Sequence, residues 1–262
     1  MYAENIALSV CVITKNEEHK LYTCLNSVRW ASEVIVVDDF SSDETSIICA
    51  NFKNVKYFIR KFDGFGMQKN HAISLATNEW ILNIDADEEV TPELQAEIQS
   101  ILKENSPCSG YWIRRKNLWF GKYNTDNYPG SLRLFKKSTG RFNESYVHEK
   151  VELDGTTGQL QAVLLHKPSS FENLQNHCAT YAIKYGKLAA KDYYKRGKRI
   201  TALNFLWKTL LLPIVVFVRE YLVKKRFLLG RSGLYISLCS ALCYHTAYVN
   251  LARIQKDHSA KS

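Results

Sequence analysis

Four short apolar runs constrain the fold of this chain more than any other feature. They cover residues 6–13, 34–39, 55–60 and 80–85. Segments with helical spacing or helix-capping residues separate them, at residues 21–28, 45–48 and 67–76. Buried parallel strands have this near-continuous apolar character, and right-handed crossover helices connect them. The alternation predicts an α/β fold with a mostly parallel, Rossmann-like sheet and helices on both of its faces.

The pattern changes after a helix predicted from Thr91 to about Lys103. Residues 111–120 and 131–137 are aromatic and rich in β-formers, and no helical segment lies between them. Such segments favour strands, so we expect the sheet to continue with antiparallel or mixed pairing. From Phe171 onward the chain becomes helical and basic.

Acidic residues follow three of the apolar runs, at residues 16–18, 38–39 and 85–87. Parallel strands bring their carboxyl ends to one edge of a sheet, where ligands of open α/β folds bind. Clustered carboxylates repel one another unless a cation or a hydrogen-bonding ligand lies between them. A nucleoside diphosphate with a divalent cation meets both needs.

The acidic turn at residues 85–87 has a simpler explanation as well. Thr91, Pro92 and Glu93 are good residues for the start of a helix, so the acids could merely lead into it. The sequence contains neither Gly-x-Gly-x-x-Gly nor Gly-x-x-x-x-Gly-Lys-Ser/Thr. A dinucleotide-binding fold and a P-loop are therefore not supported.

Four segments together resemble glycosyltransferase family 2, the inverting sugar-nucleotide enzymes with the GT-A fold. They are residues 9–18, 36–45, 66–72 and 83–89. The resemblance implies a catalytic domain over residues 1–170, with a nucleotide-sugar half (1–105) and an acceptor half (106–170). It also implies a nucleotide-sugar site in which Asp39 contacts the base and Lys69 lies near the diphosphate; the implied site residues are Thr14, Glu17, Asp38, Asp39, Lys69 and Asp85. The implied metal, Mg²⁺ or Mn²⁺, would be bound by Asp85 and Asp87, with Glu89 and His166 as further ligands.

An inverting enzyme of this family needs a carboxylate to deprotonate the acceptor hydroxyl. The Glu-Asp pair of many relatives is missing here, but Val147-His148-Glu149 resembles a segment of the lipopolysaccharide inner-core β-glucosyltransferase subgroup. We predict Glu149 as the base, with Glu144 second. Alternatively, Glu149 only pairs with Arg133 or Lys150. Arg133 and His148 are predicted on the acceptor side.

The net charge of +9 is unevenly distributed. Residues 178–262 contain 16 Lys/Arg against 3 Asp/Glu, and the remainder contains 19 against 23. Two apolar stretches, 203–218 and 232–252, accompany these cations. The first contains Lys208 and Pro213 and is shorter than the roughly 20 apolar residues that a bilayer requires. The second is long enough but contains Ser, Tyr, His and Asn residues, so neither stretch is expected to span a bilayer. We expect residues 171–262 to form amphipathic helices at the cytoplasmic surface of the inner membrane. Alternatively, these helices pack on the catalytic domain or form a homo-oligomer.

The start of the sequence lacks the features of a signal peptide, so we expect a cytoplasmic protein. Seven cysteines without a Cys-x-x-Cys pair suggest reduced thiols rather than a disulfide framework or zinc site.

The predicted activity is metal-dependent transfer of a hexose, with glucose from UDP-glucose as first choice, to a lipid-linked lipopolysaccharide core oligosaccharide. One alternative acceptor is a polyprenyl phosphate. A different class of function, a non-enzymatic basic protein that binds membrane or nucleic acid, explains the basic tail but not the acidic strand ends, which would repel phosphate. We therefore expect no nucleic-acid partner.

Overall fold

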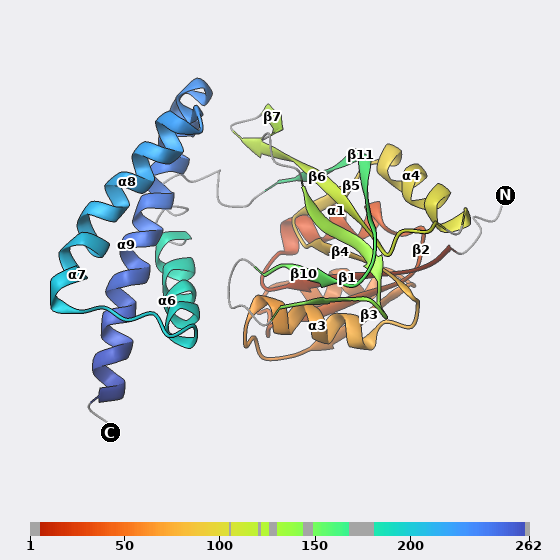
Figure 1. Cartoon of the computed structure of the whole chain (residues 1–262). Helices are drawn as coiled ribbons and strands as arrows, with labels where there is room; N and C mark the ends of the chain where they lie inside the picture. The colour runs from red at the N-terminus through yellow and green to blue at the C-terminus, as the bar shows by residue number, and fades with distance from the viewer. Residues whose placement is uncertain are drawn as a thin grey trace. The chain divides into compact units, whose positions relative to one another are not determined.

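The structure is a computed structural model of the 262-residue chain, and it describes residues 6–104, 106–119, 122–125, 130–143, 149–167 and 181–259. The chain divides into two compact units, residues 1–169 and 170–262 (Figure 1). Each unit is described by itself.

The N-terminal unit is built on a nine-stranded mixed sheet with the order β3-β2-β1-β4-β8-β6-β11-β5, and β7 pairs with β6. β1 (Ile6–Thr14), β2 (Ala31–Asp38), β3 (Val55–Ile59) and β4 (Trp80–Asp85) are parallel neighbours. These are the four strands predicted from the apolar runs. Their crossover helices are α1 (Glu18–Ser27), α2 (Thr45–Ala50) and α3 (Phe65–Leu75).

The sheet becomes antiparallel where β8 (Ser131–Lys136) joins β4, which confirms the expected change of pairing. β6 (Gly110–Trp119) lies antiparallel to β8, and β11 (Thr157–His166) lies parallel to β6. The short strand β5 (Glu88–Val90) pairs antiparallel with the end of β11. The sequence did not predict β5 or β11. The remaining elements are β7 (Lys122–Thr125), α4 (Pro92–Lys103) and the pair β9 (Gly140–Phe142) and β10 (Val151–Leu153).

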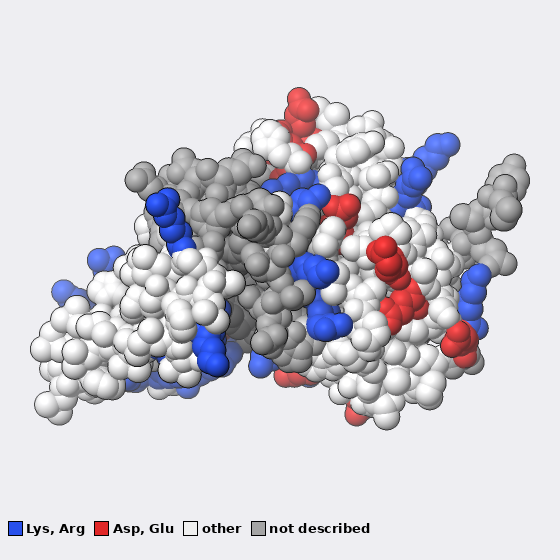
Figure 2. All heavy atoms as spheres, turned by 90° about the horizontal axis from the view of Figure 1, so that it is seen from above, with Lys and Arg blue, Asp and Glu red and all other residues white. Residues whose placement is uncertain are grey.

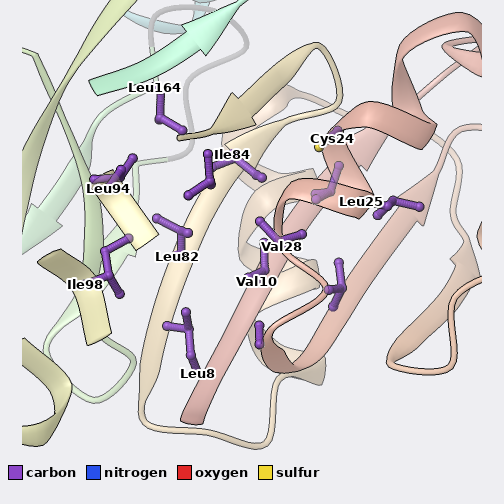
Figure 3. Packing of buried hydrophobic residues seen from close by; sticks show 14 of the residues in the cluster. Leu8, Val10, Cys24, Leu25, Val28, Leu82, Ile84, Leu94, Ile98 and Leu164 are labelled. Carbon is purple, nitrogen blue, oxygen red and sulfur yellow. The ribbon is translucent and has the colours of Figure 1, made fainter. Parts of the chain in front are cut away.

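Helices cover both faces of the sheet, as predicted. On one face, Leu8 and Val10 of β1 pack with Leu82 and Ile84 of β4, with α1 and with Leu94 of α4 (Figure 3). On the other face, α3 packs on Cys11, Ile35, Ile81 and Phe135. Successive side chains of a strand point to opposite faces, so strands covered on both sides are apolar throughout.

One buried charge lies near the beginning of β2, at the opposite end of that strand from Asp38. The Oε1 atom of Glu33 accepts hydrogen bonds from Ser9 and Thr77, and its Oε2 atom lies 2.6 Å from Lys56 Nζ. Burial alone would raise the pKa of Glu33, but these hydrogen bonds outweigh it and lower the pKa from 4.5 to about 2. Glu33 therefore ties the starts of β1, β2 and β3 to residues 77–78.

The C-terminal unit is helical. It contains a π-helical turn (Tyr181–Tyr185), α6 (Gly186–Lys195), a continuous helix Ala202–Val223, a 3₁₀ turn (Arg226–Leu229) and α9 (Arg231–Ser259). Among its described residues, one buried cluster consists of Ala190, Tyr248 and Leu251. Cys239 is disulfide-bonded, contrary to the expectation of reduced thiols, and its partner is not among the described residues.

The helix Ala202–Val223 corrects the length predicted for the first apolar stretch. It runs for 22 residues through Lys208 and Pro213, in alternating α and π turns: α7 (Ala202–Leu206), π (Trp207–Leu211), α8 (Leu212–Val218) and π (Arg219–Val223). By length and composition alone it could cross a membrane. The sequence-based estimate was too short because it ended the helix at Val218. The C-terminal unit, at the left of Figure 2, is largely white, and the charged side chains visible on it are blue.

Candidate active site

The carboxyl ends of β1, β2 and β4 lie side by side, as the sequence predicted. β1 is flanked by the other two strands: Thr14 is in register with Asp38 of β2, and Ile13 with Asp85 of β4. Asn16 and Phe40, just beyond the ends of β1 and β2, both have positive φ angles, of 54° and 52°. Such angles are uncommon for residues other than glycine. The backbone therefore turns sharply at this edge of the sheet.

Asp85 is the centre of a group of charged residues. Its Oδ1 lies 3.0 Å from Lys69 Nζ of α3, and its Oδ2 lies 3.2 Å from Arg133 Nη2 of β8. Burial opposes ionisation of Asp85, but the charges of Lys69 and Arg133 outweigh it and hold the pKa of Asp85 well below its usual range. Asp85 is therefore a carboxylate fixed by two cations.

Glu149 belongs to the same group. Its Oε1 lies 2.7 Å from Lys69 Nζ, so one ammonium group binds both Asp85 and Glu149. Burial would lower the pKa of Lys69, but the two carboxylates raise it above its ordinary value. Glu149 pairs with Lys69 rather than with Lys150 or Arg133, the two partners considered from the sequence. The sequence did not predict Lys69 as its partner.

A fifth member, Glu88, was missed by the sequence analysis. It is fully buried; its Oε1 lies 2.9 Å from Arg133 Nη2 and 3.2 Å from Arg115 Nη1, and its Oε2 accepts the Asp85 amide hydrogen bond at 2.9 Å. Burial would lower the pKa of Arg133, but Glu88 and Asp85 raise it above its usual range. We call Lys69, Asp85, Glu88, Arg133 and Glu149 the Asp85 cluster. Arg133, predicted on the acceptor side, is held within this cluster.

Asp87 and His166 form a second pair beside the cluster. His166 Nε2 lies 3.1 Å from Asp87 Oδ2, and its Nδ1 lies 2.8 Å from Asn117 Oδ1. Antiparallel pairing of β11 with β5 sets His166 opposite Glu88. The structure therefore brings two of the four predicted metal ligands together.

The other two predicted ligands have cationic partners. Asp85 is bound by Lys69 and Arg133, and Glu89 Oε2 lies 2.8 Å from Lys167 Nζ. Within the described ranges, no three His, Cys, Asp or Glu side chains gather closely enough to hold a metal ion.

Of the residues predicted to bind the nucleotide, two aspartates have partners within the protein, and one threonine hydroxyl has none among the described residues. Asp38 is buried and accepts hydrogen bonds from Ser41 and Tyr57, so it holds its own turn. Asp39 Oδ2 lies 2.7 Å from Lys15 Nζ. By contrast, the buried Thr14 hydroxyl has no hydrogen-bond partner among the described residues, which suits a ligand-binding group.

Two residues proposed for the acceptor side lie outside the described residues. They are His148 and the second candidate base, Glu144.

Glu17, predicted to line the nucleotide, directly precedes α1, and its Oε2 lies 3.5 Å from Lys20 Nζ.

Comparison with known proteins identifies the family. Residues 9–162 match the model described as Glycosyl transferase family 2. They contain β2, β3, β4, most of β1 and the whole Asp85 cluster. The chain belongs to glycosyltransferase family 2. As a family 2 glycosyltransferase it is an enzyme, so the alternative of a non-enzymatic binding protein is set aside.

Two relatives resemble this glycosyltransferase over nearly its whole length. An uncharacterized glycosyltransferase of Rickettsia felis is 30% identical, over 95% of this chain and 89% of the relative. A protein of Rhizobium meliloti named lipopolysaccharide core biosynthesis glycosyltransferase LpsC is 26% identical, over 98% of this chain and 95% of the relative.

Two solved structures share the fold. S. aureus TarS in complex with UDP-GlcNAc has a TM-score of 0.51 at 14% identity, covering 94% of this chain and 92% of that one. The mannosyltransferase PcManGT of Pyrobaculum calidifontis, in complex with GDP-Man and Mn²⁺, has a TM-score of 0.51 at 15% identity, covering 94% and 87%. The predicted GT-A-like fold is confirmed.

Asp87 and His166 offer a carboxylate and an imidazole nitrogen, donor types that divalent cations accept, but the described residues place no third such ligand beside them. Asn117 Oδ1 contacts Nδ1 of His166, and the ring thereby directs its Nε2 toward Asp87 Oδ2. A carbonyl-type oxygen that fixes the histidine tautomer is a common outer partner of metal-binding histidines.

Proposed function

We propose that this glycosyltransferase is an inverting, metal-dependent hexosyltransferase that uses a UDP-sugar, with UDP-glucose as first choice. Its acceptor would be a lipid-linked core oligosaccharide of lipopolysaccharide. The similarity to LpsC over both whole chains supports the acceptor class. The resemblance of residues 147–149 to the inner-core β-glucosyltransferase subgroup supports the sugar.

One observation carries the mechanism: Lys69 Nζ lies 3.0 Å from Asp85 and 2.7 Å from Glu149. Asp85 on the donor side and Glu149, the proposed base, therefore share the Lys69 ammonium group, which holds these two carboxylates at a fixed separation. Such positioning of the reacting groups contributes much of the rate of group-transfer enzymes. Lys69 occupies one Glu149 oxygen, Oε1, and Oε2 is the atom that would take the acceptor proton.

The other residues have roles on the donor side. Thr14 and Glu17 would line the nucleotide, Asp39 would contact the base and Asp85 the ribose. Asp38 supports the turn that carries Asp39, because its oxygens bind Ser41 and Tyr57. Asp87 and His166 would hold Mg²⁺ or Mn²⁺, and when bound that ion supplies positive charge to the departing diphosphate. Glu89 is a weaker candidate ligand because Lys167 binds it.

On the acceptor side, His148 would orient the oligosaccharide, and Arg133 would keep Asp85 and Glu88 in place rather than bind the sugar directly. Because the acceptor is lipid-linked, the enzyme would work on the cytoplasmic side of the inner membrane.

The test is transfer from radiolabelled UDP-glucose, UDP-galactose, UDP-GlcNAc and GDP-mannose to truncated core oligosaccharides, with Mn²⁺, Mg²⁺ or a chelator. We expect transfer from UDP-glucose that the chelator abolishes. Glu149→Gln should lower kcat by roughly 10²–10⁴-fold while UDP binding measured by calorimetry persists, because general base catalysis is lost and the donor site is not. Glu152→Gln is the matched control, because Glu152 lies on the surface of β10.

Two outcomes would contradict the proposal. A near-normal rate for Glu149→Gln would remove the base and favour a polyprenyl phosphate, whose acceptor oxygen is already ionised. Unchanged Mn²⁺-dependent UDP binding by Asp87→Asn would remove the metal assignment.

A further inference from the structure

The helix Ala202–Val223 has two unlike faces. One face packs on α9 and buries Thr209, Pro213, Val216 and Glu220. The other face presents large apolar side chains to solvent at intervals of three or four residues along the whole helix: Leu203, Leu206, Trp207, Leu210, Leu211, Ile214, Val215, Val218 and Leu222. Leu203 is 98% exposed and Ile214 59%.

Further large apolar residues are exposed elsewhere in the C-terminal unit. Phe227 and Leu228 lie in the 3₁₀ turn, and Leu234, Leu238 and Leu242 are spaced four residues apart on α9. We call the exposed face of Ala202–Val223, from Leu203 to Leu222, the apolar face. An exposed helix face with this many large apolar side chains marks a binding surface for a protein or a membrane.

Cations flank both ends of the helix. Lys195, Arg196, Lys198 and Arg199 precede it, and Lys224, Lys225, Arg226 and Arg231 follow it. Glu220 is the only acidic residue among residues 195–231, and Arg219, Lys224 and Arg226 bind it. The charge that borders the apolar face is therefore strongly positive, which complements an anionic lipid surface and would repel a second copy of the same face.

The distribution of charge favours a helix lying in the plane of the bilayer surface over one that crosses it. A helix of 22 residues is about 33 Å long, enough to span. Crossing would carry the turn at residues 224–231, with its four cations, to the far side, against the preference of cations for the cytoplasmic side. A helix in the plane needs only one apolar face and keeps both basic ends near lipid headgroups.

We propose that the apolar face binds the surface of an anionic lipid bilayer, with the helix Ala202–Val223 lying in the plane of the interface. The basic residues at its two ends contact the headgroups, and α9 covers the side that faces away from the lipid. This inference concerns the C-terminal unit alone and does not depend on the sugar or acceptor proposed above.

The test is flotation of the full-length protein with phosphatidylcholine vesicles, with and without one quarter phosphatidylglycerol. We expect binding to the anionic vesicles that weakens with salt and is released by alkaline carbonate. Ile214→Glu should weaken binding by roughly 10-fold or more, because an apolar side chain no longer enters the interface. Ile47→Glu is the matched control, since Ile47 is equally exposed in the N-terminal unit, at 62%.

A second pair of variants tests the charges. Lys225→Glu combined with Arg231→Glu should weaken binding to the anionic vesicles by roughly 10-fold or more, whereas Lys53→Glu combined with Lys61→Glu should leave it unchanged. Binding that resists carbonate would mean a spanning helix and would overturn the proposal. Absence of vesicle binding, whether or not the protein forms dimers in sedimentation velocity, would also overturn it. If the protein does not bind vesicles but still transfers sugar to a soluble acceptor, the membrane proposal fails and the proposed function stands.

Discussion

The two units handle apolar and charged side chains in opposite ways. In the N-terminal unit the apolar residues are enclosed between the sheet and its helices, and buried charges are paired, as at Glu88 and Glu33. The C-terminal unit, by contrast, holds 18 of the 23 large apolar side chains that are exposed among the described residues. The N-terminal unit therefore buries most of its apolar side chains, whereas the C-terminal unit exposes many of them to solvent.

This difference means that the same substitution should have unequal effects in the two units. In the N-terminal unit a side chain matters through its neighbours in the folded chain. In the C-terminal unit an exposed apolar side chain matters through what the protein binds. Four experiments test the comparison, in order of decreasing expected effect.

The largest effect is expected from Lys69→Met. The substitution leaves the Asp85 and Glu149 carboxylates facing each other without the ammonium group that binds both. Removing one partner of a buried ion pair costs about 3–5 kcal/mol, whereas Lys225→Met, at an exposed position, should change the stability by less than about 0.5 kcal/mol. Hydrogen exchange of the β4 and α9 amides, followed by mass spectrometry, measures each unit separately. Equal effects of the two variants would contradict the comparison.

The next test exchanges leucine for alanine in each unit. Leu82 is fully buried between β1, α1 and α4, so Leu82→Ala should destabilise the N-terminal unit by about 2–5 kcal/mol. Leu210 is 53% exposed, and Leu210→Ala should change the stability of the C-terminal unit by less than about 0.5 kcal/mol. Hydrogen exchange of β4 and α9 reports on each unit separately. A large loss at Leu210 would mean that its side chain is covered within the protein.

The third test uses pH. The folded chain lowers the pKa of Glu33 from 4.5 to about 2, so ionised Glu33 stabilises the N-terminal unit at neutral pH, and this contribution is lost as the pH falls from about 4.5 toward 2. The free energy of unfolding of Glu33→Gln should therefore be lower by up to about 3 kcal/mol at pH 7, and the difference should shrink in acid. Urea titrations at several pH values measure it. A difference that is independent of pH would contradict the role of the charge, and Glu152→Gln serves as the surface control.

The smallest effect concerns a helix cap. Thr91 caps α4: its hydroxyl accepts a hydrogen bond from the Leu94 amide at 3.2 Å. Thr91→Ala should cost about 1 kcal/mol of stability, and Thr91→Ser should restore most of it. Faster exchange of the first-turn amides of α4 would report the loss. No change in those amides would show that the turn before α4, rather than the cap, fixes the start of the helix.

Local patterns predicted the N-terminal half of the fold well. The four parallel strands, their three crossover helices and the start of α4 at Thr91 all follow from apolar runs and capping residues. The meeting of Thr14, Asp38 and Asp85 at one edge followed from the rule for parallel strands. These features depend on residues close together in the sequence, which is why the sequence reveals them.

The pairing of distant segments could not be predicted in this way. Glu88 and Glu89 are adjacent and chemically alike, yet Glu88 is buried against Arg133 while Glu89 binds Lys167 at the surface. The register of β5 on β11 decides which of them points inward, and β11 itself was not expected. The Lys69 partner of Glu149 was missed for the same reason. The helix Ala202–Val223 was ended too early because Arg219 and Glu220 interrupt its apolar character, although Glu220 is buried on α9.

The ion pair of Lys69 with Glu149 can form only late in the synthesis of the N-terminal unit. The two residues lie 80 positions apart, so at a synthesis rate of roughly 5–20 residues per second Glu149 is added about 4–16 seconds after Lys69. Lys69 and Asp85 can meet early, but Arg133 of β8 and then Glu149 arrive only once the mixed half of the sheet has been made. A nascent chain can therefore build its parallel half while still lacking the carboxylate proposed to activate the acceptor. Completion of the catalytic centre is postponed until the N-terminal unit is nearly fully translated.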